Sequence, residues 1–135
     1  MTGLARSIGA FLVLVLAAGC SGMLGRTSRS VTSVRGKLHV SGQALHPGWV
    51  EFWPVEGTVG NMRAAKLAAD GTFAATRVPV GRVLVRFVPS AKVATGDLRL
   101  DRLAASCMGF DSPVRIMVPD RPDWLDIDIG NQEIR

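Results

Sequence analysis

Ala69-Asp70-Gly71-Thr72-Phe73 and, shortly after, Val78-Pro79-Val80-Gly81-Arg82 are two turn signals in this chain of 135 residues. Apolar and polar residues alternate on both sides of Asp70-Gly71, and an Asp-Gly pair in that setting is typical of a β-hairpin. Pro79 fixes φ and Gly81 tolerates unusual backbone angles, which predicts a second reversal of the chain. We therefore expect a domain of short strands organised around these two turns.

The same alternation continues outward from this hairpin and predicts seven strands. The most regular is the one after Gly81, where Val83, Val85 and Phe87 share one face. Short strands separated by turns at near-regular spacing indicate an all-β sandwich with a single core. The predicted strands cover residues 34–41, 49–55, 61–68, 72–78, 82–89, 113–118 and 124–129.

Residues 91–111 interrupt the strand pattern. Their apolar side chains recur at helical spacing, which predicts one short helix or loop insertion near residues 95–108. Thr95 is the candidate N-cap, Asp97 would lie in the first turn, and Gly109 would end the helix. The face expected to pack on the core consists of Leu100, Leu103, Ala104 and Cys107.

The N-terminal segment is typical of a bacterial lipoprotein signal. Arg6 supplies the positive charge, residues 8–18 are apolar but too short to span a bilayer, and small residues precede Cys20. This ending resembles a lipobox, in which the cysteine thiol is acylated after export. The resemblance implies a signal peptide over 1–19, a lipid attached to Cys20, and a flexible tether over 20–33. The alternative is an ordinary cleaved signal with an incidental cysteine.

Basic residues outnumber acidic ones, 16 to 11, which gives a formal net charge of +5. Arg26, Arg29, Arg35 and Lys37 lie close behind Cys20, where they could contact anionic lipid head groups. The alternative is a solvated tether. The basic residues do not alternate with aromatic ones, which argues against nucleic acid as a partner.

Several motifs in order resemble the carboxypeptidase regulatory-like domain. The resemblance covers roughly residues 34–130 and implies a seven-stranded, transthyretin-like (prealbumin-like) Greek-key β-sandwich over residues 34–135. The motifs are Val34-Arg35-Gly36-Lys37-Leu38, Gly42-Gln43-Ala44-Leu45, Val50-Glu51-Phe52-Trp53-Pro54, the two turns quoted above, Asp111-Ser112-Pro113-Val114 and Trp124-Leu125-Asp126-Ile127-Asp128-Ile129.

The residues required for catalysis on this fold are not found in the sequence. Related enzymes use tyrosine, and this chain has none. His39, at an outward strand position, and His46, in a turn, are expected to be surface residues without metal-binding spacing. Asp120, Asp123, Asp126 and Asp128 do not form a calcium loop and are expected to be solvated. We therefore predict no catalytic residue, no metal and no cofactor.

Two further features concern cysteine and tryptophan. Cys107 is expected to be a buried small hydrophobe, the alternative being a pairing between chains. Trp49, Trp53 and Trp124 fall on the parity opposite the core residues. They are a possible binding face for an envelope glycan or protein. The alternative is that residues 91–108 fold across the sheet and cover them.

Taken together, these expectations describe a lipoprotein exported and lipid-anchored to a bacterial cell-envelope membrane, with a non-catalytic β-sandwich that binds a partner or has a structural role. The alternative is an accessory subunit of an envelope enzyme or transport complex. A small hydrolase on the same fold is disfavoured by the missing residues.

Overall fold

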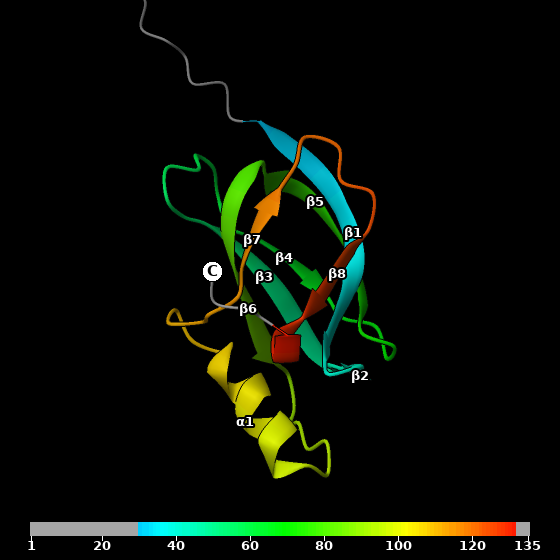
Figure 1. Ribbon diagram of the computed structural model, residues 1–135. Helices are drawn as coiled ribbons and strands as arrows, with labels where there is room; N and C mark the ends of the chain where they lie inside the picture. Colours follow the sequence, from blue (N-terminus) through cyan, green and yellow to red (C-terminus); the bar gives the residue numbers. More distant parts are fainter. Residues whose placement is uncertain (1–29, 132–135) are drawn as a thin grey trace, which may run out of the picture.

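The computed structural model describes residues 30–131, which form eight strands in two facing sheets with one short helix (Figure 1). The helix, α1 (Leu98–Ser106), lies between β6 and β7, and a 3-10 turn, η1 (Ile129–Asn131), follows the last strand. The predicted mainly-β, sandwich-like domain is confirmed. The strands are β1 (Val31–Val40), β2 (Gln43–Ala44), β3 (Gly48–Pro54), β4 (Arg63–Lys66), β5 (Thr72–Pro79), β6 (Gly81–Pro89), β7 (Arg115–Val118) and β8 (Leu125–Asp128).

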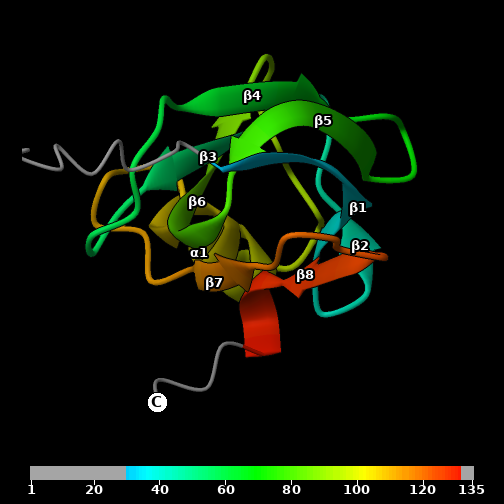
Figure 2. The same ribbon diagram turned by 90° about the horizontal axis from the view of Figure 1, so that it is seen from above.

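The two sheets differ in strand direction. In the first, called the β1 sheet, β1 pairs antiparallel with β2 and β5 and parallel with β8. The second, called the β3 sheet, is antiparallel with the order β4-β3-β6-β7. Figure 2, which looks along the sandwich, shows the two sheets on either side of the core. Within residues 30–131 no ladder joins β4 to β5 or β7 to β8, so the sheets do not close into a barrel.

Seven of these strands overlap the predicted ones, and the prediction was wrong in three details. β2 is an additional two-residue strand that pairs with the end of β1 across Ser41-Gly42. β1 starts at Val31, so residues 31–33 belong to the sheet and not to the predicted tether; Val31 pairs with Pro79 of β5. β4 covers only half of the predicted range, in line with the weak strand propensity of its alanines.

The expected hairpin at Asp70-Gly71 is not formed, although the turn itself is. Gly71 has φ +80°, its N–H donates to the carbonyl of Ala68 at 2.8 Å, and Thr72 N–H donates to Asp70 Oδ1 at 3.0 Å. However, β4 before the turn belongs to the β3 sheet and β5 after it belongs to the β1 sheet. The turn at Pro79 and Gly81 returns the chain to the β3 sheet as β6. Both turns therefore connect the sheets.

The core lies between the inward faces of the two sheets. Phe52 of β3 and Phe73 of β5 meet across it, with ring centroids 5.6 Å apart and planes tilted by 52°. The alternation predicted on β1 and β6 is confirmed, since Val34, Leu38 and Phe87 are fully buried. Each such side chain contributes about 1.5–3 kcal/mol by its burial.

Helix α1 lies at the end of the sandwich opposite to where the chain enters β1 (Figure 1). Its N-cap is Asp97, which accepts a hydrogen bond from Arg99 N–H at 2.8 Å, so the predicted Thr95 cap was wrong. Thr95 instead donates through its hydroxyl to Asp101 Oδ1 at 2.8 Å, ahead of the first turn. Ala104 and Cys107 are buried against the core and Leu100 and Leu103 partly so, which confirms the predicted face.

Candidate functional site

The outward side of β3 carries two of the three tryptophans proposed as a binding face. Trp49, Glu51 and Trp53 alternate with the buried Val50 and Phe52 and so point away from the core. We call this surface, with the outward side chains of the adjacent strands, the β3 face. Its neighbouring members are Lys66 on β4, opposite Trp49, and Val88 and Arg86 on β6, opposite Trp49 and Glu51.

Trp53 is part of a polar and aromatic cluster on the β3 face. Its Nε1–H donates to Glu51 Oε2 at 2.8 Å, and Arg86 Nη1 donates to the same oxygen at 3.0 Å. The Trp53 and Phe110 rings form a T-shaped pair, with centroids 4.9 Å apart and an interplanar angle of 81°. Such an edge-to-face pair contributes about 0.5–1.5 kcal/mol beyond its area. The Nε1–H group of Trp53 and its ring therefore both make contacts within the domain.

Arg86 joins this cluster to the segment after α1. Its Nε and Nη2 atoms both donate to the carbonyl of Met108, at 3.3 and 2.9 Å. Its Cζ atom lies 4.1 Å from the centroid of Phe110, a cation–π distance. Because Arg86 and Glu51 are each largely buried, the pair holds residues 108–110 against the sheet. The residue that packs on Trp53 is Phe110, which lies just beyond the segment 91–108 that was expected to cover the tryptophans.

Trp49 remains available on the β3 face, with 44% of its surface exposed. Its nearest cross-strand neighbours are the exposed Lys66 and the half-buried Val88. A half-exposed indole next to a cation on an open sheet can stack on a sugar ring or pack against another protein.

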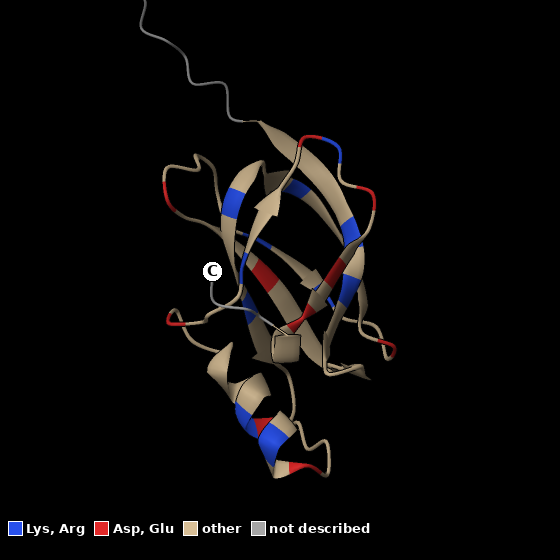
Figure 3. Cartoon of the chain, viewed as in Figure 1, with Lys and Arg blue, Asp and Glu red and all other residues tan. Residues whose placement is uncertain are grey.

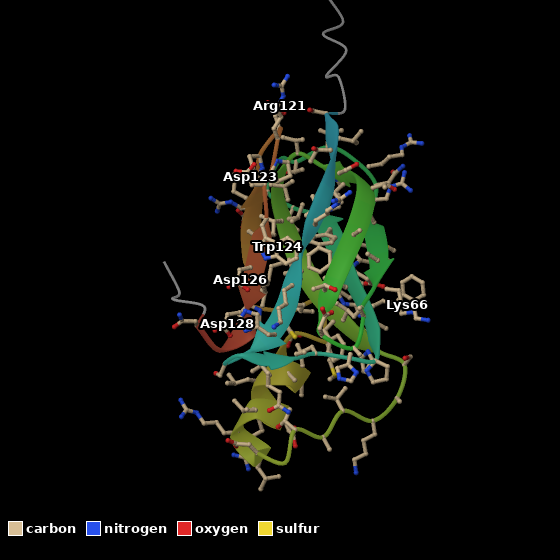
Figure 4. All side chains as sticks on the ribbon, turned by 90° about the vertical axis from the view of Figure 1, so that its right-hand side faces the viewer. Lys66, Arg121, Asp123, Trp124, Asp126 and Asp128 are labelled. Carbon is tan, nitrogen blue, oxygen red and sulfur yellow. The ribbon has the colours of Figure 1, made fainter. Side chains whose placement is uncertain are left out.

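Trp124 does not belong to this surface. It precedes β8 of the β1 sheet and is 54% exposed. Figure 4 shows Trp124 on one side of the molecule and Lys66, the neighbour of Trp49, on the other. The parity of each tryptophan was predicted correctly. The prediction that Trp49, Trp53 and Trp124 form one face was wrong, because the parity of a residue within its strand does not say to which sheet the strand belongs.

His39 is buried, which corrects the expectation that it lies on the surface. Its Nε2 atom lies 2.5 Å from Asp126 Oδ1, and its Nδ1 atom accepts the Gly42 N–H at 3.1 Å. The second bond assigns the proton of the neutral ring to Nε2. Asp128 Oδ1 lies 3.8 Å from Nδ1 and accepts the N–H of Ser41 at 2.9 Å. The parallel pairing of β8 with β1 brings these residues together.

This His39–Asp126 arrangement suits a structural role better than catalysis. A general base needs a ring nitrogen that can reach the proton of a substrate, and both nitrogens of His39 are hydrogen-bonded within the fold. His46 is exposed, as predicted. Among residues 30–131 there is no group of three or more histidines, cysteines or carboxylates placed to hold a metal ion.

Cys107 is buried, as predicted, and its surroundings disfavour the reactive thiolate form. The Sγ atom lies 3.0 Å from the carbonyl of Ala104, and burial raises the pKa of the thiol to about 12. A nucleophilic cysteine requires the opposite shift. Cys20, the proposed site of lipid attachment, lies outside the described residues, as do residues 1–29 as a whole.

Two open pockets flank the start of β1. The first, of about 510 Å³, is bordered by Ser30, Val59, Val80, Arg82 and Met117, and by Glu56. Glu56 accepts hydrogen bonds from Arg82 at 2.8 Å and from Arg115 at 2.7 Å, and these bonds lower the pKa of its carboxyl group. The second pocket, of about 450 Å³, is lined by Val31, Thr32, Ser33, Arg77, Arg121 and Pro122.

Comparison with protein-family models, curated proteins and solved structures finds no match for this chain. Its function must therefore be argued from its own residues. In the part of the chain described, no helix is long and apolar enough to cross a membrane.

Proposed function

We propose that this protein is an exported bacterial lipoprotein, anchored to a cell-envelope membrane through acylated Cys20. Its β-sandwich is a non-catalytic binding or structural module of the carboxypeptidase regulatory-like, transthyretin-like type. The observation that carries the proposal is the spacing between the cysteine and the domain. Nine residues separate Cys20 from Ser30, where the described domain begins. A lipid on Cys20 is therefore compatible with the folded sandwich.

The fold supports the family-level part of this proposal at a coarse level. Seven of the eight strands overlap the strands predicted from the alternation of residues, the two-sheet arrangement is sandwich-like, and the helix lies within the expected insertion near residues 95–108. The motifs Val50–Pro54 and Asp70–Phe73 occupy a central strand and a connection between the sheets, where they contribute Phe52 and Phe73 to the core. Fold by itself does not assign function.

The proposed absence of catalysis draws support from how the ionisable side chains are used. His39 is held by Asp126 and Gly42, Arg86 by Glu51 and Met108, and Cys107 is buried with a raised pKa. These groups stabilise the domain, and none of them lines either pocket.

The proposed binding surface is the β3 face around Trp49, and the partner is an envelope glycan or protein. Trp53 lies on the same face, where its Nε1–H and Arg86 Nη1 both donate to Glu51 Oε2. Trp124, with similar exposure on the other sheet, offers a matched control. We expect Trp49→Ala to abolish capture of the partner and Trp124→Ala to leave it unchanged. Capture that depends equally on both residues, or on neither, would overturn this assignment.

The anchor is tested by mass spectrometry of the mature N-terminal peptide and by membrane fractionation, with wild type and Cys20→Ser compared. We expect an acylated Cys20 in the wild type and release of the variant from the membrane. An unmodified N-terminus cleaved elsewhere would overturn the lipoprotein proposal. Co-purification of one defined envelope complex in a Trp49-dependent manner would favour the alternative role as an accessory subunit.

A further inference from the structure

The end of the sandwich at which the chain enters β1 combines exposed apolar side chains with arginines. Val31, Val59 and Met117 are among the exposed large hydrophobic residues, and Met117 has 59% of its surface exposed. They come from three separate elements: β1, the loop before β4, and β7. Val59 and Met117 border one of the two pockets at this end and Val31 borders the other. Exposed apolar groups gathered in this way commonly mark a contact surface.

Arg77 and Arg121 line the second pocket together with the hydroxyl-bearing Thr32 and Ser33. Arg77 is held with φ +57°, at the end of β5, and both arginines are exposed. No carboxylate borders this pocket. Figure 3 shows arginine-bearing segments of β5, β6 and the loop after β7 at this end, with acidic residues between them. Guanidinium groups beside hydroxyls are suited to phosphate oxygens.

The charge at this end is mixed, so general electrostatic attraction is modest. Arg82 and Arg115 share Glu56, and Asp120 accepts a hydrogen bond from Ser30 Oγ at 3.2 Å. Within residues 30–131 Arg77 and Arg121 form no ion pair, although Asp120 and Asp123 flank Arg121 in the sequence. A surface of this kind favours local contacts with phosphate groups combined with shallow insertion of apolar side chains.

The route of the chain indicates which surface this end meets. Ser30, the first described residue, lies at this end, and Cys20 precedes it by ten residues. Ten residues reach at most about 36 Å, close to the roughly 33 Å length of a ten-residue strand such as β1. An anchor on Cys20 therefore keeps this end of the sandwich near the bilayer.

We propose that this end docks on the anionic membrane that holds the anchor, with Arg77 and Arg121 contacting lipid phosphates and Val31, Val59 and Met117 at the head-group boundary. This orientation rests on the proposed lipoprotein function. It directs α1 and the lower part of the β3 face, including Trp49, away from the bilayer, because these lie at the opposite end of the sandwich (Figure 1).

The test uses the mature acylated protein in vesicles of phosphatidylcholine alone or mixed with phosphatidylglycerol. An environment-sensitive fluorophore is attached to Met117→Cys, or to Leu98→Cys, a control on α1 that is 76% exposed. Buried Cys107 stays unlabelled because its pKa is raised to about 12. We expect a lipid-like environment for the Met117→Cys label, stronger with phosphatidylglycerol, and an aqueous one for Leu98→Cys. Adding Arg77→Gln and Arg121→Gln should weaken the phosphatidylglycerol effect, by about fivefold per arginine.

The other outcomes separate the possible failures. Equally aqueous labels on a membrane-bound protein would overturn the docking while leaving the anchor intact. Labelling of the wild type at Cys20 would show a free thiol, and the anchor and this orientation would both fall. If inorganic phosphate without vesicles raises the melting temperature only when Arg77 and Arg121 are present, the pocket binds a soluble anion and the lipid assignment is wrong.

Discussion

Gly36 on β1 lies directly opposite Leu125 on β8, and the two backbones are too close for a side chain at position 36. A Cβ atom there would overlap the carbonyl oxygen of Leu125 and lie 2.9 Å from Cζ of Phe73. The close approach involves backbone on one side and a core aromatic on the other, so neither neighbour can move easily. A side chain at position 36 would therefore force the first and the last strand of the domain, or Phe73, to shift.

Replacing Gly36 with alanine should therefore destabilise the folded domain. We expect Gly36→Ala to lower the free energy of unfolding by about 2 kcal/mol or more, in the range of overpacking in a dense core. Urea denaturation measures the change. The control is Arg35→Ala, at the adjacent exposed position of the same strand, which should change stability by less than about 0.5 kcal/mol. Equal stabilities for the two variants would contradict the close β1–β8 contact.

The His39–Asp126 pair should stabilise the parallel junction of β1 and β8. We expect His39→Ala to cost about 2 kcal/mol, since the Gly42 N–H and Asp126 both lose their partner. Asp126 is largely exposed, so the coupling energy in a double-mutant cycle with Asp126→Ala should be smaller, about 1 kcal/mol. His46→Ala, at an exposed turn, should be neutral. A coupling energy of zero would show that the pair has no structural role.

Arg86 should contribute far more to the stability of the domain than Lys66, a lysine on the same sheet face. Arg86→Met leaves the largely buried Glu51 without its cation and removes two donors from the Met108 carbonyl, which should cost about 2–3 kcal/mol. Trp53 should then become more exposed, and its emission should shift to longer wavelength. Lys66→Met, on the neighbouring strand, should change neither quantity appreciably. If both variants behaved alike, the proposed attachment of residues 108–110 would be wrong.

The raised pKa of the Cys107 thiol predicts that the stability of the domain depends on pH in the alkaline range. Burial raises the pKa of its thiol from 9.0 to about 12, so the folded protein keeps a proton that the unfolded chain loses between these values. The free energy of unfolding should consequently fall as the pH rises from 9 toward 12. In a Cys20→Ser background, Cys107→Ala should lose less stability than its parent between about pH 8 and about pH 10.5. Parallel pH profiles would contradict this prediction.

The alternation of residues predicted most of the side chains that face the core, although His39 and Leu84, on the opposite parity, are buried as well. Val83, Val85 and Phe87 on β6 and Ala104 and Cys107 by α1 are all buried as expected. This succeeds because alternation is a local property, which follows from the backbone geometry of each strand or helix. The exchange of Thr95 for Asp97 as N-cap is the kind of small error expected where two capping residues lie close together.

Relations between strands could not be predicted in the same way. An Asp-Gly turn has the same local chemistry whether it joins neighbouring strands in one sheet or connects two sheets. The sequence therefore predicted a hairpin at Asp70-Gly71, where the chain in fact crosses between the sheets. His39 meets Asp126 from 87 positions away, through a parallel pairing that no local pattern encodes. The separation of Trp124 from Trp49 has the same cause. Each of these depends on which strands pair, which is decided by the packing of the whole core.

The pairing of β1 with β8 has a consequence for the order in which the domain can form. β1 begins at Val31 and β8 at Leu125, so the first strand obtains one of its neighbours only when nearly the whole domain is available. During synthesis or translocation from the N-terminus, that edge of β1 stays open and can pair with other chains. A chain truncated before Trp124 would retain this open edge permanently, and we expect it to aggregate or to be degraded even though most of its core residues are present.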